Sequence, residues 1–227
     1  PYALDDRVDL LVASSALEDE LGDNAFLADL NGDGADDLVI GGGEFDPGSI
    51  NKGGVFVHFG PLTAPESSDS EGVPTTELES ANLVLVGAER GDWLGYRTEA
   101  SDLNGDGYED LIVGAFYAGA NSKGLVYVVD GPVTGAAGFG DVGDYQRATF
   151  FADSGQSVGD LGQYVAMSPG DLTGDGLNDL VLGDDAYRGL TNTSNLGRVY
   201  LFDGSATGDV LADDATATVT GDVYSSG

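Results

Sequence analysis

One acidic loop occurs three times in this chain, and each copy runs directly into a short apolar segment. The copies read DLNGDGADDLVIG from Asp29 to Gly41, DLNGDGYEDLIVG from Asp102 to Gly114, and DLTGDGLNDLVLG from Asp171 to Gly183. A single Asp-Asn-Gly cluster usually marks an exposed turn, but three copies with the same flanks are far more specific. The pattern predicts three copies of one structural unit, each with one cation site.

Oxygen-bearing side chains recur at positions one, three, five and nine of each loop, counted from its first aspartate. Position six is always glycine, which tolerates the positive φ that a loop around a cation requires. Position seven varies, as suits a ligand that offers only its backbone carbonyl. The predicted ligands are Asp29, Asn31, Asp33, Ala35 and Asp37 in the first loop, Asp102, Asn104, Asp106, Tyr108 and Asp110 in the second, and Asp171, Thr173, Asp175, Leu177 and Asp179 in the third.

The donor chemistry favours Ca²⁺ as a structural ion in all three loops. Hard oxygen ligands in a flexible loop suit Ca²⁺ better than Mg²⁺, and a chain with no Cys and one His is a poor zinc binder. An EF-hand is excluded because position twelve, where that motif needs a bidentate Glu, is Ile40, Val113 or Leu182. We expect the third site to be the weakest, since the short hydroxyl of Thr173 replaces an Asn amide.

Other landmarks keep the spacing of the loops, which start 73 residues apart (29 to 102) and then 69 apart (102 to 171). A Leu-Gly pair precedes each loop, and a segment of the type VYVVDG follows each apolar run. Each unit then reads as four short strands separated by Gly-rich turns, which is typical of propeller blades. The expected fold is all-β, one propeller segment over residues 1–227, with repeats at about 21–93, 94–160 and 161–227 and a remnant of a preceding repeat at 1–20.

The order Leu-Gly, strand, DxNxDGxxD loop, DLIVG strand and GxVYVxDG resembles the FG-GAP repeat of integrin α-subunit β-propellers and their non-animal relatives. The resemblance covers about residues 21–221, with Leu in place of the first Phe in every repeat. It implies that the Ca²⁺ loop joins strands one and two of each blade. It also implies that a protein or glycan ligand meets loops on the opposite face, here residues 42–53, 115–124 and 184–197.

The blade count leaves the ring open, because propellers close with four to eight blades and this chain supplies three. The missing blades would come from outside this chain segment or from another copy that completes the ring. Residues 1–20 have two interpretations: Arg7 to Ala13 forms the outer strand of a preceding blade, or Asp5, Asp9 and LLVA form a decayed loop and strand.

Composition narrows the partners and the cellular location. Forty acidic and eight basic residues give a formal charge of −32, which excludes nucleic acid and anionic lipid as good partners. No stretch resembles a membrane span, so membrane insertion is not expected. Acidity and calcium loops favour a secreted or cell-surface protein that is stabilised by packing and metal, because the chain has no cysteine.

Three further features have a functional and an ordinary interpretation. Arg90-Gly91-Asp92 is an adhesion tripeptide, yet the repeat itself favours Gly-Asp before Leu-Gly. Gly155-Gln156-Ser157-Val158-Gly159 matches a hydrolase elbow, yet it lacks the strand-to-helix context, and the one histidine, His58, reads as a packed strand residue. Aromatic residues beside the connecting loops either bind ligand or close the contacts between blades; they are Phe45, Trp93, Tyr96, Phe116, Tyr117, Tyr145 and Tyr187.

The expected function is a non-catalytic extracellular module for adhesion or ligand binding, and no enzyme activity is expected. The alternative is a carbohydrate-directed role, as a lectin-like propeller or as a non-catalytic part of a secreted polysaccharide-degrading enzyme.

Overall fold

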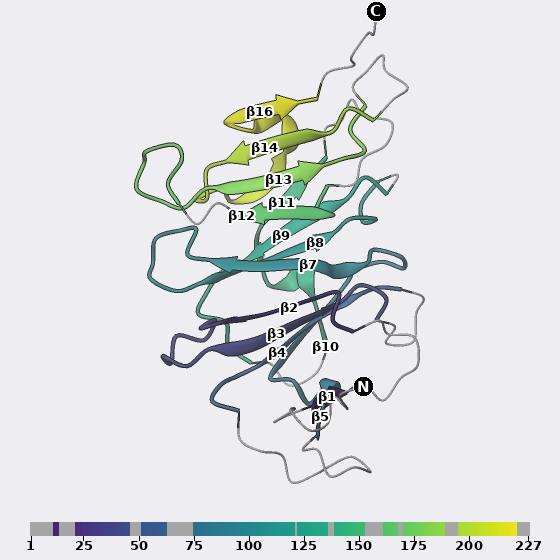
Figure 1. The fold of residues 1–227 in the computed structure, drawn as a ribbon, viewed down its shortest axis with the longest axis vertical. Helices are drawn as coiled ribbons and strands as arrows, with labels where there is room; N and C mark the ends of the chain where they lie inside the picture. The colour runs from purple at the N-terminus through teal and green to yellow at the C-terminus, as the bar shows by residue number, and fades with distance from the viewer. Residues whose placement is uncertain are drawn as a thin grey trace, which may run out of the picture.

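The structure, a computed structural model, describes residues 11–13, 21–45, 51–62, 75–120, 122–135, 139–152, 161–167, 170–188 and 195–221. It is all-β, with twisted sheets stacked along the long axis of the molecule from the N-terminal end to the C-terminal end (Figure 1). The prediction of an all-β fold made of propeller blades is confirmed, and the sheets do not close into a ring.

Each blade has four antiparallel strands in chain order, numbered here from the inner to the outer edge. The first blade contains β2 (Asn24–Ala28), β3 (Asp37–Gly42), β4 (Gly54–His58) and β6 (Leu83–Val86). The second contains β7 (Leu94–Ser101), β8 (Asp110–Ala115), β9 (Leu125–Val129) and β11 (Gln146–Phe151). The third contains β12 (Tyr164–Met167), β13 (Leu180–Asp184), β14 (Arg198–Phe202) and β16 (Ala217–Thr220).

Each repeat also has a short strand that the four-strand prediction missed. These strands are β5 (Thr75–Glu77), β10 (Phe139–Asp141) and β15 (Gly208–Leu211), and each lies between strands three and four of its own repeat. β10 pairs in parallel with β6, and β15 pairs in parallel with β11, so each adds a fifth strand to the preceding blade. Segments such as TTE and FGD are too short to show the alternation that identifies a strand in a sequence.

A 3₁₀ turn follows each of these strands at once: η2 (Leu78–Ser80), η3 (Val142–Asp144) and η4 (Ala212–Asp214). The first residue of each turn, Leu78, Val142 or Ala212, is fully buried in an apolar cluster. We call each strand with its 3₁₀ turn a latch, because it fastens one repeat to the outer strand of the blade before it.

The first latch, β5 with η2, pairs in parallel with β1 (Leu11–Ala13). β1 therefore stands to β5 as β6 stands to β10 and as β11 stands to β15. This geometry is that of an outer strand, and it agrees with the first of the two interpretations of the N-terminal segment. The rest of residues 1–20 lies outside the described residues.

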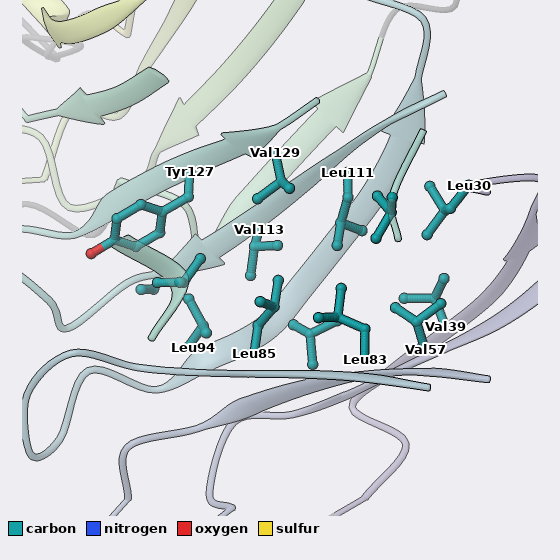
Figure 2. Packing of buried hydrophobic residues seen from close by; sticks show 14 of the residues in the cluster. Leu30, Val39, Val57, Leu83, Leu85, Leu94, Leu111, Val113, Tyr127 and Val129 are labelled. Carbon is teal, nitrogen blue, oxygen red and sulfur yellow. The ribbon is translucent and has the colours of Figure 1, made fainter. Parts of the chain in front are cut away.

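The faces of adjacent blades are joined by buried apolar layers, which we call seams. Figure 2 shows the first seam, where side chains of the first blade point toward side chains of the second. Its members include Leu30, Val39, Val57, Leu83 and Leu85 from the first blade and Leu94, Leu111, Val113, Tyr127 and Val129 from the second. Burial of each such side chain contributes about 1.5–3 kcal/mol, so the seams supply most of the cohesion between blades.

Successive residues of the inner strands serve opposite seams. In β8, Val113 lies in the first seam, whereas its neighbour Ile112 lies in the second seam with Val126, Phe150, Leu182 and Tyr200. Side chains alternate between the two faces of a strand, so a strand covered on both faces must be apolar at every position. This requirement accounts for the uninterrupted Leu-Ile-Val run after the acidic loop.

The Leu-Gly pairs are the points of closest approach between blades. The Leu94 N–H donates to the Lys52 carbonyl at 3.1 Å, and the Leu161 N–H donates to the Lys123 carbonyl at 3.1 Å. A Cβ on Gly41 would overlap the Gly95 carbonyl oxygen, and a Cβ on Gly114 would overlap that of Gly162. The first seam therefore requires glycine at position 41 on β3, and the second seam requires glycine at position 114 on β8.

Replacing Gly114 with Ala is expected to lower the free energy of unfolding by about 1–3 kcal/mol, because a methyl group there overlaps fixed backbone. Gly183→Ala is the matched control, since Gly183 holds the same repeat position but lines an open hollow. Urea unfolding of both variants checks this. Equal loss of stability in the two variants would contradict the proposed role of the close approach.

Candidate functional site

The three acidic loops lie at one end of the blades, each between the first and second strands. The first joins β2 to β3, the second joins β7 to β8, and the third precedes β13, with residues 168–169 outside the described part. Neighbouring blades place neighbouring loops side by side, as the packing of Tyr108 over Gly32 and of Leu177 over Gly105 shows. The position that the repeat resemblance implied for the loops is the one found.

Within each loop, the aspartate at position one accepts backbone N–H groups. Asp29 Oδ1 accepts from Gly32 at 2.8 Å and from Asp33 at 3.1 Å, and its Oδ2 accepts from Gly34 at 2.9 Å. Asp102 and Asp171 make the same three bonds in their own loops. In the third loop these N–H donors, that of Gly176 foremost, hold the pKa of Asp171 below its ordinary value. In all three loops these N–H donors fix the orientation of the position-one carboxylate.

The aspartate at position nine is buried beneath each loop. Asp37 Oδ2 accepts the N–H groups of Leu30 at 3.0 Å and Asn31 at 3.2 Å, while Oδ1 accepts from Asn31 Nδ2 at 3.3 Å and the Gly60 N–H at 2.9 Å. Burial raises the pKa of Asp37, and burial likewise raises the pKa of Asp110. A carboxylate accepts about four hydrogen bonds. Asp37 is therefore saturated, and a cation reaches it only if the Asn31 amide gives way.

The donor set at the outer part of each loop fits a hard cation. Positions one, three and five supply two carboxylates and an amide or hydroxyl on one exposed turn, and Asp33 Oδ1 and Asn31 Oδ1 each accept a single backbone N–H. These oxygens keep lone pairs for a ligand. Among the described residues, no three or more His, Cys, Asp or Glu side chains converge in a ready-made metal cluster. Calcium binding by all fifteen predicted ligands therefore stays a prediction.

The second loop has a neighbour that the sequence did not indicate. The guanidinium of Arg147, in β11, lies 2.6 Å from Asp130 Oδ1 and 3.5 Å from Asp110 Oδ2, the position-nine carboxylate. The Arg147 charge lowers the pKa of Asp110 and so opposes the larger effect of burial. Asn82 and Thr216 hold the corresponding place before β6 and β16, so this cation distinguishes the second loop from the other two.

Position eight links the second and third loops to the loop that precedes each of them. Glu109 accepts the backbone N–H of Asp29, and Asn178 Nδ2 donates to Ser101 Oγ and to the Asp102 carbonyl, both at 3.0 Å. Burial raises the pKa of Glu109, and the charges of Asp29, Asp36 and Asp102 raise it further. The aspartate at position one of a predicted cation site is thus hydrogen-bonded through its backbone to the next loop. A polar residue at position eight of every copy was the available signal in the sequence.

The opposite end of the blades carries a cluster of four aromatic side chains, Trp93, Tyr96, Phe116 and Tyr117, which we call the aromatic group. The Trp93 ring lies 5.6 Å from that of Phe116 and 5.5 Å from that of Tyr117, and Phe116 lies 4.8 Å from Tyr96. Phe116 is buried, whereas Tyr117 is 43% exposed. Trp93 holds a positive φ of 56°, an uncommon conformation for a bulky residue.

The other three aromatic residues noted in the sequence are Phe45, Tyr145 and Tyr187, and they divide between packing and exposure to a ligand. Phe45 and Tyr187 are buried, Phe45 against Phe56 and Tyr187 beneath the Arg198 guanidinium, so they serve packing. Tyr145 is exposed, but it adjoins the start of β11 at the metal-loop end. The loop residues 46–50, 121 and 189–194, and the Gly155–Gly159 elbow motif, lie outside the described residues.

The Arg90-Gly91-Asp92 tripeptide is not displayed for recognition. Asp92 is 5% exposed, and its Oδ2 accepts the Glu89 N–H at 2.7 Å. Burial raises the pKa of Asp92. A carboxylate held inward in this way shapes the turn before Leu94, which is the ordinary interpretation of the motif.

Glu109→Ala is expected to lower the free energy of unfolding by about 1 kcal/mol, because it removes the acceptor for the Asp29 N–H. Glu109→Gln should lose less, since its amide oxygen still accepts that bond while the repulsion from nearby carboxylates falls. Urea unfolding in the presence of chelator isolates this effect from metal binding. If both variants lost stability equally, the link between loops would not explain the loss.

Comparisons with known proteins agree with the geometry. The family model described as the FG-GAP repeat matches residues 94–129, from β7 to β9. Integrin alpha pat-2 of Caenorhabditis elegans is 33% identical over 122 residues, which is 50% of this chain and 9% of the relative. Integrin alpha-V of Gallus gallus is 28% identical over 214 residues, which is 90% of this chain and 17% of the relative.

A third relative is an enzyme. Phosphatidylinositol-glycan-specific phospholipase D of Homo sapiens is 36% identical over 115 residues, which is 48% of this chain and 13% of the relative. The chain thus spans no more than 17% of the length of these three relatives. The repeat match and the integrin relatives together support similarity of this chain to the FG-GAP repeats of integrin α subunits.

Proposed function

We propose that this chain is a calcium-stabilised, non-catalytic binding module that works outside the cell. Its similarity to FG-GAP repeats and to integrin α subunits supports an integrin-like ligand-binding role in general terms. The observation that carries the specific proposal is that the two ends of the blades carry different kinds of side chains. One end holds three acidic loops that are linked by hydrogen bonds, and the other end carries the aromatic group with its exposed Tyr117.

In this proposal, calcium acts by preorganisation. A cation bound by positions one, three and five would neutralise carboxylates that otherwise repel each other. The loops are continuous with β3, β8 and β13, the central strands of the blades, so a rigid loop gives the loops at the far ends of these strands a fixed base. A surface that is already ordered loses less conformational entropy when it binds a ligand.

Two features support a non-catalytic role. His58, the single histidine, is 3% exposed inside β4, where the equivalent residues are Val129 and Phe202. Burial lowers the pKa of His58, so it stays neutral and packed and does not face a substrate. The chain has only eight Lys and Arg residues, and Arg147 and Arg198 among them are engaged with Asp130 and Tyr187.

An extracellular location fits the chemistry of the loops. Millimolar extracellular calcium keeps moderate-affinity oxygen sites filled. Integrin α relatives are cell-surface proteins. Among the described residues there is no helix with the length and apolar character needed to cross a membrane.

Removing calcium with a chelator is expected to lower the melting temperature, and Ca²⁺ should restore it far better than Mg²⁺. A site held at about 100 times its Kd contributes about 2.7 kcal/mol. For a chain of this size, that corresponds to roughly 5–10 °C per site. Asp106→Ala should reproduce part of the drop in calcium buffer, because it removes a ligand from the second loop. Differential scanning calorimetry measures all of these changes.

Asp144→Ala is the matched control, since Asp144 is an exposed carboxylate in η3, outside the loops. It should melt like the parent chain in both buffers. An unchanged melting temperature for the parent chain in chelator would remove calcium from the proposal.

A carbohydrate ligand is the second candidate, and it is favoured by the aromatic group, in which Tyr117 is exposed. Aromatic rings stack on the apolar faces of sugars, and one relative is named for specificity toward phosphatidylinositol-glycan. On an array of immobilised oligosaccharides, Trp93→Ala and Tyr117→Ala should each weaken any glycan binding at least about tenfold. Tyr145→Ala, an exposed tyrosine at the metal-loop end, should leave it intact. Glycan binding that survives both substitutions would place the sugar elsewhere.

A further inference from the structure

The third blade has an apolar face that no described residue covers. Leu172, Val199 and Val219 are 67%, 44% and 72% exposed. The residues at the same places in the first two blades are fully buried: Leu30 and Leu103 for Leu172, Val55 and Val126 for Val199. Cross-strand pairing makes Leu85 and Phe150 the counterparts of Val219, and these are buried too. This face is therefore built as one side of a seam.

A hollow of about 360 Å³ adjoins this face, at the repeat position where the Leu-Gly turn is seated in the other seams. Gly183, Leu196 and Gly197 line it. They are the repeat equivalents of Gly41, Lys52 and Gly53, which receive the Leu94-Gly95 turn. The third blade thus offers the backbone groups that seat a Leu-Gly turn in the first and second blades.

The first blade carries a Leu-Gly turn without such a seat. Gly22 has a φ of 91°, close to the 89° of Gly95 and the 87° of Gly162. A Cβ on Gly22 would meet nothing within 4 Å, whereas one on Gly95 or Gly162 would meet backbone of the neighbouring blade. Leu21 is half-buried, whereas Leu94 and Leu161 are fully buried.

The latches show the same mismatch at the two ends of the stack. β16 is the last strand of its sheet among the described strands, and all four of its residues are exposed. β6 and β11 each receive a latch from the next repeat. At the other end, among the described strands, β5 of the first latch pairs with β1 alone, in a two-stranded sheet (Figure 1).

We propose that the open face of the third blade binds the first blade of a second copy of this chain. Leu21-Gly22 of the second copy enters the hollow beside Gly183, and the latch of β5 leaves β1 and pairs in parallel with β16. The contact is head to tail, and it extends the two seams already present in the chain. Two copies joined by two such contacts give a closed ring of six blades, within the range of four to eight that propellers use.

Two effects oppose this association, a competing strand pairing and charge repulsion, and both set the conditions for testing it. β1 occupies the place that β16 would take, so it must leave β5 first. Each chain also has a formal charge of −32, which repels a second copy at low ionic strength. Dimerisation should therefore strengthen when salt is raised or when residues 1–13 are deleted.

Light scattering coupled to gel filtration, at high salt with calcium, tests the contact by mass. The full chain should show twice the mass of one chain as its concentration rises, and deletion of residues 1–13 should tighten the association at least about tenfold. Val199→Asp and Val219→Asp should each abolish it. Leu62→Asp, at an exposed leucine of the first repeat, is the matched control and should leave it unchanged.

Disulfide trapping in the full chain provides a second test that does not depend on the deletion. A Cβ on Gly43 would lie 3.3 Å from the Tyr96 Cβ across the first seam. A disulfide joins Cβ atoms about 3.5–4.5 Å apart. Asp185 and Asp23 hold these two places at the proposed contact, and the chain has no cysteine of its own. Mixing Asp23→Cys with Asp185→Cys should give a linked dimer, whereas mixing Asp23→Cys with Asp144→Cys should not.

Longer head-to-tail oligomers that Val199→Asp abolishes would also support the proposal, because such contacts need not close into a ring. Monomers at every concentration, with no specific trapping, would overturn it, because the open face would then not bind a second copy. Dimers that persist in Val199→Asp and Val219→Asp would overturn it as well, since they would use a different surface.

Discussion

The structure depends on the backbone contacts that the Leu94-Gly95 and Leu161-Gly162 turns make with a glycine of the preceding blade. The Gly95 carbonyl lies against Gly41, and that of Gly162 lies against Gly114, with no room for a methyl group at either point. Sheets held this close can bury their facing side chains and gain the attraction that dense packing provides. The same spacing lets Glu109 and Asn178 reach the loop of the blade before them.

Much of this arrangement could be predicted from the sequence because its causes are local. The acidic loops, the apolar strands covered on both faces and the Leu-Gly pairs each leave a repeated pattern. The latches could not be predicted, since their pairing is decided by the outer strand of a different repeat. Arg147 was missed for the same reason: only the folded sheet brings β11 beside the second loop. The saturation of Asp37 by backbone donors was also beyond a spacing argument, which counts oxygens but not the hydrogen bonds they already accept.

The two ends of the blades respond to different physical demands. At the loop end, carboxylates are concentrated on exposed turns and ordered by N–H groups, an arrangement that tolerates charge and invites a cation. At the other end, the aromatic group gathers around Trp93, a residue with a positive φ whose ring lies against the rings of Phe116 and Tyr117. The burial of Asp92 shows how a short motif can match an adhesion signal while its carboxylate serves the turn that leads into the next blade.

The latches also mean that the repeats in the sequence and the sheets in space are not the same units. The first sheet is completed by β10, which belongs to residues 94–160, and the second is completed by β15, which belongs to residues 161–227. A cassette cut at the repeat boundaries would therefore strip the outermost strand from the sheet upstream and carry away a strand with no partner. No crossover point between the first two sheets keeps both of them whole, because β10 of the first sheet lies between β9 and β11 of the second sheet along the chain.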